Sequence, residues 1–220
     1  MAAVDCSPLA DCKVVHFLRH AQAESNAAAH QFPKDSDEYN AAYEDEKYFD
    51  SVLSEKGAKQ CLELRQKLLS NSSFPPPGVV LASPLRRTLQ TATKVFKDPN
   101  ETDAPRVPWI ALEEAREYSH GYARPCDYRN SPDVQAGQFP HVDFTGVPAG
   151  EDSFAGKPET EEELDKRCQA LLARLQARPE GTIAVVSHVG FLTRLFAKHL
   201  KWEGEAAFAN CELRSVVLRF

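Results

Sequence analysis

Short apolar runs recur along the chain and are separated by longer segments of mixed polarity. Several runs are rich in β-branched or aliphatic side chains, as buried strands are: 13–18 (KVVHFL), 78–83 (GVVLAS), 106–112 (RVPWIAL) and 182–187 (TIAVVS). Residues 212–220 (ELRSVVLRF) predict a final strand at the end of the chain.

The segments between these runs carry apolar side chains at helical spacing. Residues 54–70 predict an amphipathic helix, and residues 84–96 predict a helix with Pro84 in its first turn. Residues 160–177 open on a Thr-x-x-Glu capping box, and 190–200 follow a strand directly. This alternation predicts an α/β fold, a three-layer α/β/α arrangement with a mostly parallel central sheet.

The length of 220 residues, with 42% hydrophobic side chains, fits one domain over 1–220 with a sizeable core. Residues 31–50 and 118–158 are too long to be tight connections. We interpret both as lid segments inserted over the carboxyl ends of the strands.

Charge and cysteine usage exclude several classes of protein. With 32 acidic and 26 basic residues the net charge is −6, so no overall positive field exists to attract nucleic acid or an anionic membrane. No apolar run is long enough to span a bilayer. The six cysteines form no Cys-x-x-Cys pair and no secretory segment precedes them, which favours reduced thiols and a cytoplasmic location. No His-Glu-x-x-His motif occurs, and we expect no metal site.

Basic side chains follow three of the predicted strands. Arg19 and His20 follow the first strand, Arg86 and Arg87 follow the second, and His188 follows the strand at 182–187. Taken singly, these residues could be a solvated strand end, a solvated helix face and a buried core histidine. The carboxyl ends of parallel strands share one edge of the sheet, where ligands bind, so their agreement favours an anion site.

Four sequence motifs carry a more specific resemblance: LRHAQAESN (18–26), LSEKG (53–57), SPLRRTLQTA (83–92) and VVSHVGFL (185–192). Together they resemble the histidine phosphatase superfamily, the phosphoglycerate mutase-like group, from about residue 13 to residue 218. The family's asparagine, six positions beyond the histidine, corresponds to Asn26. In the family's Ser-x-x-x-Arg-x-x-x-Thr segment Arg87 matches the arginine, whereas Arg86 falls on a variable position.

Three further segments narrow this resemblance: REYSHGYARPCDYR (116–129), EDSFAGKPETEEELDKR (151–167) and FANCELRSVV (208–217). They are similar to phosphoglycerate mutase-like proteins of plants and fungi, most of which are expected to be phosphatases. The chain has His-Ala after Arg19 where the true mutases have His-Gly, and it lacks their long substrate-binding segment. The resemblance therefore implies a phosphatase rather than a mutase.

Phosphoryl transfer explains the residue types of the predicted site. Arg19 and Arg87 can clamp the phosphoryl oxygens with planar, always-charged guanidinium groups. His20 can attack phosphorus through one ring nitrogen if the other donates to a backbone carbonyl, which gives a phosphohistidine. A protonated His188 and the Asn26 amide would add donors to the same oxygens. This chemistry requires no cofactor.

The leaving oxygen needs a proton donor, and four acids lie close together in the chain: Glu113, Glu114, Glu117 and Asp127. A run of acids is often only solvated surface. In the plant-like relatives the acid sits in an Arg-Glu pair upstream of Pro-Cys-Asp, which implies Glu117. The mutase pattern instead implies Glu114, two residues beyond Leu112, and this alternative stays open.

The sequence therefore predicts a metal-independent phosphatase that hydrolyses phosphomonoesters through a phosphohistidine on His20. The partner is a small phosphorylated metabolite or another phosphomonoester. Phosphoglycerate mutase-type transfer and an idle phospho-ligand binding module are the alternatives. Polar residues of the second lid segment would contact the rest of the substrate or lie on the surface: His120, Tyr122, Arg124 and Arg129. The oligomeric state is left open.

Overall fold

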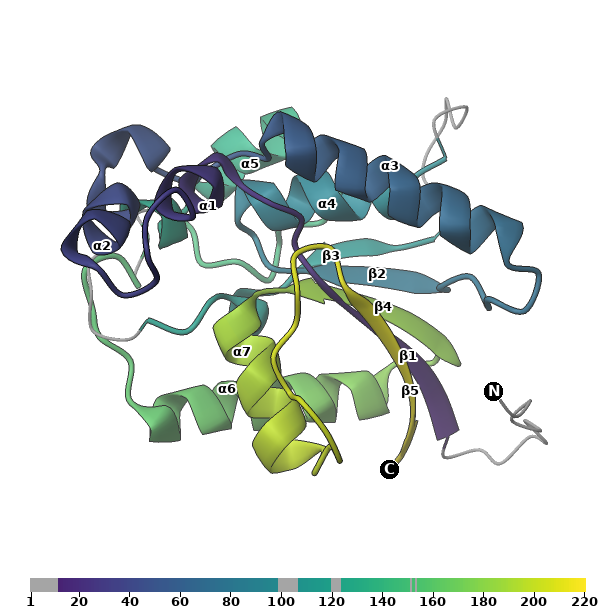
Figure 1. Cartoon of the computed structure of the whole chain (residues 1–220). Helices are drawn as coiled ribbons and strands as arrows, with labels where there is room; N and C mark the ends of the chain where they lie inside the picture. The colour runs from purple at the N-terminus through teal and green to yellow at the C-terminus, as the bar shows by residue number, and fades with distance from the viewer. Residues whose placement is uncertain (1–11, 99–106, 120–123, 151, 153) are drawn as a thin grey trace.

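The fold is built on a five-stranded sheet with the strand order β3-β2-β4-β1-β5 (Figure 1). A computed structural model describes residues 12–98, 107–119, 124–150, 152 and 154–220. The strands are β1 (Cys12–Arg19), β2 (Val79–Ala82), β3 (Trp109–Ala111), β4 (Thr182–Ser187) and β5 (Leu213–Arg219). β1, β2, β3 and β4 run parallel to one another, and β5 is antiparallel to β1.

Helices cover both faces of the sheet and form the connections. They are α1 (Glu24–Ala29), α2 (Asp37–Glu44), α3 (Glu55–Ser70), α4 (Arg86–Phe96), α5 (Pro132–Gln138), α6 (Glu161–Ala177) and α7 (Val189–Arg194). Short 3-10 turns occupy η1 (Glu46–Tyr48), η2 (Glu113–Ala115) and η3 (Pro125–Asp127), and a π-helical turn, η4 (Leu195–His199), continues α7. No helix in the described part of the chain is long and apolar enough to cross a membrane.

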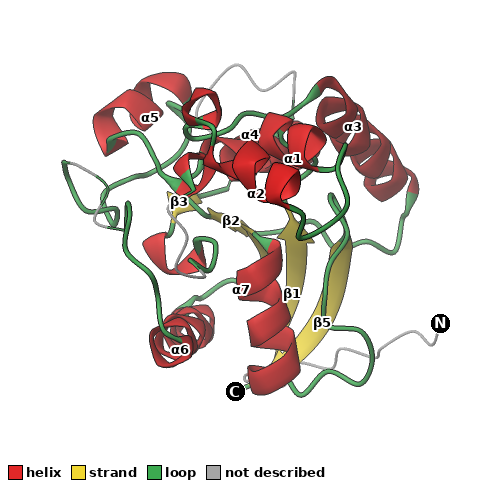
Figure 2. Ribbon diagram, turned by 60° about the vertical axis from the view of Figure 1, so that its left-hand side comes forward, coloured by secondary structure: helices red, strands yellow, loops and turns green. Residues whose placement is uncertain are grey.

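The core lies in two layers, one on each face of the sheet. Val185 of β4 packs in one layer with Leu171 of α6 and Phe191 of α7, whereas Val186 packs in the other with Leu89 of α4. Figures 1 and 2 show α6 and α7 on one face and α3 and α4 on the opposite face. Strands buried on both faces read as continuous apolar runs. The predicted three-layer α/β/α fold is confirmed.

The parallel register aligns the carboxyl ends of the central strands. Arg19 of β1 lies beside Ser187 of β4, and Ala82 of β2 lies beside Val186 of β4. The residues that directly follow these three strands therefore meet at one edge of the sheet, where a parallel α/β fold places its ligands.

Two predicted helices are confirmed together with their caps. Ser54 accepts a hydrogen bond from the backbone N–H of Gly57 at the start of α3, and Thr160 forms a capping box with Glu163 at the start of α6. The predicted start of the helix at 84–96 is wrong, because Pro84 precedes it. Leu85 stays extended and buries its side chain fully, so α4 begins at Arg86.

The two predicted lid segments are folded differently from simple loops. Residues 31–50 contain α2 and η1, and residues 118–158 contain η3 and α5. Positions 120–123, 151 and 153 of the second segment lie outside the described residues. That these two segments open and close over the site stays a prediction.

Gly57 allows the backbone of α3 to lie close to the backbone of the segment that follows β1. A Cβ atom at Gly57 would lie 2.0 Å from the carbonyl oxygen of Gln22, which is backbone. Gly57→Ala should therefore lower the free energy of unfolding by about 1–3 kcal/mol through overpacking, measured by urea denaturation.

Gly137→Ala is the matched control, because a Cβ there meets no heavy atom within 4 Å and the position is helical. It should leave stability unchanged or raise it by up to about 1 kcal/mol. Equal effects of the two substitutions on the free energy of unfolding would show that the close contact with Gln22 does not determine the stability.

Candidate active site

A cavity of about 150 Å³ opens where β1, β2 and β4 end. The predicted site residues that line it are Arg19, His20, Asn26, Arg87 and Glu117. Asp127, which the sequence offered only as one of four acids, lines the same cavity. Residues from the strand ends, from α1 and α4 and from the segment after β3 are therefore brought together as the motifs predicted.

His20 is held in one tautomer. Its side chain is 2% exposed, and its Nδ1 lies 2.8 Å from the carbonyl oxygen of Ala21, so Nδ1 carries the proton and donates. Its Nε2 then has a lone pair, which faces the Nε–H of Arg87 at 3.3 Å. Burial, and then the charges of Arg87 and Arg19, lower the pKa of His20 well below its usual value. The ring is therefore neutral and its Nε2 is nucleophilic.

The backbone of His20 is fixed by the far end of the chain. Its carbonyl oxygen accepts from the backbone N–H of Cys211 at 3.2 Å and from Nδ2 of Asn210 at 3.2 Å. Its own N–H donates to the carbonyl of Ser187 at 2.9 Å. The loop before β5 and the end of β4 thus hold this residue in place.

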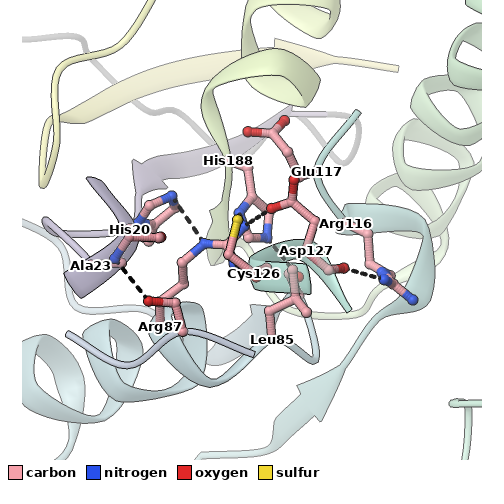
Figure 3. A network of polar contacts seen from close by, with 12 residues as sticks. His20, Ala23, Leu85, Arg87, Arg116, Glu117, Cys126, Asp127 and His188 are labelled. Atoms are coloured by element: carbon pink, nitrogen blue, oxygen red, sulfur yellow. Dashed lines mark hydrogen bonds and ion pairs between the residues drawn. The ribbon is translucent and has the colours of Figure 1, made fainter. Parts of the chain in front are cut away.

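Arg87 is the centre of the polar network in Figure 3. Only 3% of it is exposed, yet its guanidinium donates to the Cys126 carbonyl at 2.5 Å, to Asp127 Oδ1 at 2.7 Å and to His188 Nδ1 at 2.9 Å. Burial acts to lower the pKa of Arg87, but the charge of Asp127 leads the effects that raise it. Arg87 is therefore a buried, permanently charged group and not part of a solvated helix face.

His188 lies behind Arg87 and is fully buried. A guanidinium only donates, so Nδ1 of His188 accepts from Arg87, and its Nε2–H donates to Ser83 Oγ at 2.8 Å. Burial, and then the charge of Arg87, lower the pKa of His188 well below its usual value. The ring is neutral in the structure, and the charged donor that the sequence analysis expects here stays a prediction.

Arg19 and Asn26 differ in how their polar atoms are used. Arg19 donates from Nη1 to the carbonyl of Phe208 at 2.7 Å, but its buried Nε has no acceptor among the described residues. Asn26 accepts from the N–H of Ala23 through Oδ1, and its Nδ2 donates to the Tyr43 hydroxyl at 3.0 Å. A buried guanidinium N–H without an acceptor suits an anion in the cavity.

Glu117 projects into the cavity and is anchored by backbone donors. Its Oε1 accepts from the N–H of Tyr118 at 2.8 Å and from the N–H of Phe191 at 3.2 Å. Burial, and then the charge of Asp127, raise the pKa of Glu117 above its usual value. A Cβ at Gly190 would lie 2.6 Å from Oε1, so the glycine gives this carboxyl group its room. The arrangement suits a proton donor.

The other acids of this segment point elsewhere. Glu114 Oε1 pairs with Arg174 Nε at 2.7 Å, away from the cavity, and Glu113 pairs with Arg116 and Arg129. Geometry therefore favours Glu117 over Glu114 as the acid that can reach a bound phosphoryl group. The choice between them stays a prediction.

Arg86 has a structural environment that the sequence did not reveal. Its backbone N–H donates to Asp50 Oδ1 at 2.8 Å, and its Nε donates to the Asp50 carbonyl at 2.7 Å. Asp50 is fully buried and also accepts from Asn130 and Gln135. Asp50 thus ties both predicted lid segments to α4, and no motif or spacing in the sequence signals this role.

Residues of the second lid segment divide into two groups. Arg124 lines the cavity, with its guanidinium 4.7 Å from the centre of the Tyr43 ring. Arg129 is buried and paired with Glu113, so the structure does not favour a contact between Arg129 and the substrate. His120 and Tyr122 lie outside the described residues. Tyr39 and Tyr43 also line the cavity, and their spacing of one helical turn is a signal from which the sequence could have indicated this aromatic wall.

The described residues contain no group of three or more His, Cys, Asp or Glu side chains that could hold a metal ion. Cys12, Cys61, Cys126, Cys168 and Cys211 are free thiols.

Comparisons by sequence and by structure give one consistent set of relatives. The family model of the histidine phosphatase superfamily (branch 1) matches residues 15–218. Phosphoglycerate mutase-like protein 1 of Arabidopsis thaliana is 34% identical, over 99% of this chain and 85% of its own length. Phosphomutase-like protein 3 of Candida albicans is 28% identical, over 84% of this chain and 60% of its own. The predicted resemblance to plant and fungal proteins is confirmed.

A solved structure agrees with the fold. Ecdysone phosphate phosphatase from Bombix mori, in complex with tungstate, has a TM-score of 0.60 at 18% identity. The match covers 92% of this chain and 88% of that one. At this identity the likeness concerns the fold alone.

The neutral histidines of the site make stability depend on pH. Because the pKa values of His20 and His188 are lowered in the fold, unfolding frees both rings to bind protons below their ordinary pKa of about 6.5. The free energy of unfolding should therefore fall as the pH drops below about 6.5, by up to about 1.4 kcal/mol per pH unit for each histidine. Urea denaturation at several pH values measures this slope.

His188→Gln should lower the slope of the free energy of unfolding against pH, because one of the two buried histidines no longer contributes. His30→Gln, at an exposed position, is the control and should change this slope less. Resonances of His20 or His188 that titrate in the native protein at the ordinary pKa would contradict the neutral assignment.

Proposed function

This chain belongs to the histidine phosphatase superfamily, and on that premise we propose that it is a metal-independent phosphatase that hydrolyses phosphomonoesters through His20. One observation carries the proposal. The Nε2 lone pair of His20 lies 3.3 Å from the Nε–H of Arg87, and both residues line the cavity, while the proton on Nδ1 is held by the Ala21 carbonyl. A histidine fixed in this way is prepared to attack phosphorus.

The first step transfers the phosphoryl group to the protein. Arg19 and Arg87 bind its oxygens, and Nε2 of His20 forms a bond to phosphorus as the bond to the leaving oxygen breaks. Glu117 gives its proton to that oxygen, and the alcohol leaves. The Ala21 carbonyl stabilises the positive charge that develops on the ring, because it already accepts from Nδ1–H.

The second step releases the phosphoryl group to water. Water attacks phosphorus, the bond to Nε2 breaks, and the Glu117 carboxylate takes the proton of the water. Asn26 and His188 are proposed to bind phosphoryl oxygens, His188 after it has gained a proton from solvent, which the negative charge of the bound phosphoryl group favours. The hydrogen bond to Ser83 keeps the His188 ring in position for this role.

The proposed substrate is a small phosphorylated metabolite or another phosphomonoester in the cytoplasm. A cavity of about 150 Å³ holds a phosphoryl group and a small part of its alcohol. The name of the ecdysone phosphate phosphatase, which shares the fold, supports a phosphate ester as substrate.

Phosphoryl transfer of the mutase type is the second candidate, and the names of the Arabidopsis and Candida relatives favour it. A mutase must keep its phosphohistidine from water and rebind the intermediate in two orientations. Incubation with phosphoglycerate and a bisphosphoglycerate separates the two reactions, because a mutase interconverts the isomers whereas a phosphatase releases inorganic phosphate.

Replacement of the nucleophile tests the proposal directly. His20→Ala should abolish turnover of p-nitrophenyl phosphate and the acid-labile phosphoenzyme while circular dichroism shows a folded protein. His30→Ala, in the same cavity, is the matched control and should retain the phosphoenzyme. Turnover by the unmodified protein should not change with a chelator. A phosphoenzyme that survives in His20→Ala excludes this nucleophile, and a folded protein that turns over no phosphomonoester is an idle binding module.

The proton donor is identified by its dependence on the leaving group. Glu117→Gln should slow hydrolysis of an alkyl phosphate by about 10²–10⁴-fold but that of p-nitrophenyl phosphate far less, because nitrophenolate leaves without a proton. Glu114→Gln loses only the ion pair with Arg174, so it should slow the hydrolysis of neither the alkyl phosphate nor p-nitrophenyl phosphate. If Glu114→Gln shows the leaving-group dependence instead, the acid is Glu114.

A further inference from the structure

In this structure Arg87, which the proposed mechanism needs for binding the phosphoryl group, already forms an ion pair with a carboxylate of the protein. Asp127 Oδ1 lies 2.7 Å from Nη2 of Arg87, inside the cavity. The other donors of Arg87 reach the neutral groups His20, His188 and the Cys126 carbonyl. Among the described residues, Asp127 is the acid that forms an ion pair with Arg87.

This contact conflicts with the binding of a phosphoryl group. A phosphoryl dianion needs the same guanidinium donors, and it would approach a carboxylate of like charge. The conflict is resolved if the Asp127 side chain turns away when the anion arrives.

We propose that Asp127 is a positioning residue that holds Arg87 until the phosphoryl group displaces its carboxylate. The proposal rests on the proposed function, since it takes Arg87 as the phosphoryl clamp. Asp127 then acts through Arg87 and through its neighbour Glu117, and sets how strongly the site binds an oxyanion.

The backbone of Asp127 is anchored, whereas its carboxylate is partly exposed and is held by Arg87. The Asp127 carbonyl accepts from Arg116 Nη2 at 2.5 Å, and Arg116 is paired in turn with Asp152. The Asp127 N–H donates to the Arg124 carbonyl at 2.8 Å. The side chain is 23% exposed, in contrast to 4% for that of Arg87, so the carboxylate can rotate toward solvent without moving the loop.

The proximity of Asp127 to Glu117 gives a second measurable effect, a change in the pKa of Glu117. The charged groups that face Glu117 are Asp127 of η3, Arg87 of α4 and Arg19 at the end of β1, and Arg167 of α6 donates to its backbone carbonyl. Removal of the Asp127 charge leaves the cations, so the pKa of Glu117 should fall. Activity that needs a protonated Glu117 should then be lost at a lower pH.

Asp127→Asn tests the proposal, because the amide oxygen can still accept from Arg87 while the charge is gone. Calorimetric titration with tungstate near pH 7 should show binding about tenfold tighter than in the unmodified protein, since a like charge beside the anion is removed. The alkaline limb of the kcat/KM profile should move to lower pH. KM should fall, and kcat at neutral pH should not rise with it.

Asp152→Asn is the matched control, because it loosens the anchor at Arg116 and keeps the carboxylate on Arg87. It should not tighten tungstate binding. If it does so as strongly as Asp127→Asn, the effect is loop loosening and the proposal is overturned. If Asp127→Asn does not fold, Asp127→Ser carries the same expectation.

The titration separates this proposal from the proposed function. Tighter tungstate binding in Asp127→Asn supports the proposal even if no phosphomonoester is turned over. Turnover by the unmodified protein, with tungstate affinity unchanged in Asp127→Asn, overturns it and leaves the phosphatase intact. Failure of both proteins to bind tungstate also overturns it.

Discussion

The charge of Arg87, buried to 3% exposure, is the constraint on which the rest of the site depends. A cation removed from water must be surrounded by acceptors. The surrounding side chains meet this need: His20 and His188 present lone pairs because they are neutral, and Asp127 presents a carboxylate. The His188 tautomer follows from this guanidinium, and the His20 tautomer follows from the Ala21 carbonyl and the guanidinium together. The contacts that make the arginine tolerable in the core therefore also fix the orientation of both rings.

Close backbone approach is the second requirement, because the site joins segments that are distant in sequence. Gly190 leaves space for the carboxyl group of Glu117 at the start of α7, and Gly57 lets α3 contact the chain after β1. Each glycine removes a side chain where two backbones meet or where a backbone meets a carboxyl group. The parallel register of β1, β2 and β4 then delivers the groups to one edge.

Sequence patterns predicted those parts of the site that periodicity or motif spacing determines. Strand ends brought Arg19, His20 and His188 to one edge, and motif register distinguished Arg87 from Arg86. The patterns left Glu117 and Glu114 both open after β3, because side-chain direction in an irregular segment decides between them.

The burial of Asp50 and the direction of its side chain follow from contacts across 80 residues with Asn130. Such contacts leave no local periodicity. The start of α4 was misplaced for a related reason, because the burial of Leu85 overrode the preference of Pro84 for a first turn.

The strand order has a consequence for how the protein is made. β1, the first strand to be synthesised, lies between β4 and β5, the last two. A growing chain on the ribosome therefore carries β1 with both edges unpaired until β4 has emerged, and with one edge unpaired until residues up to Arg219 have emerged. The site around His20 is not assembled in that interval, and the unpaired edges of β1 are exposed to pairing with other chains until then.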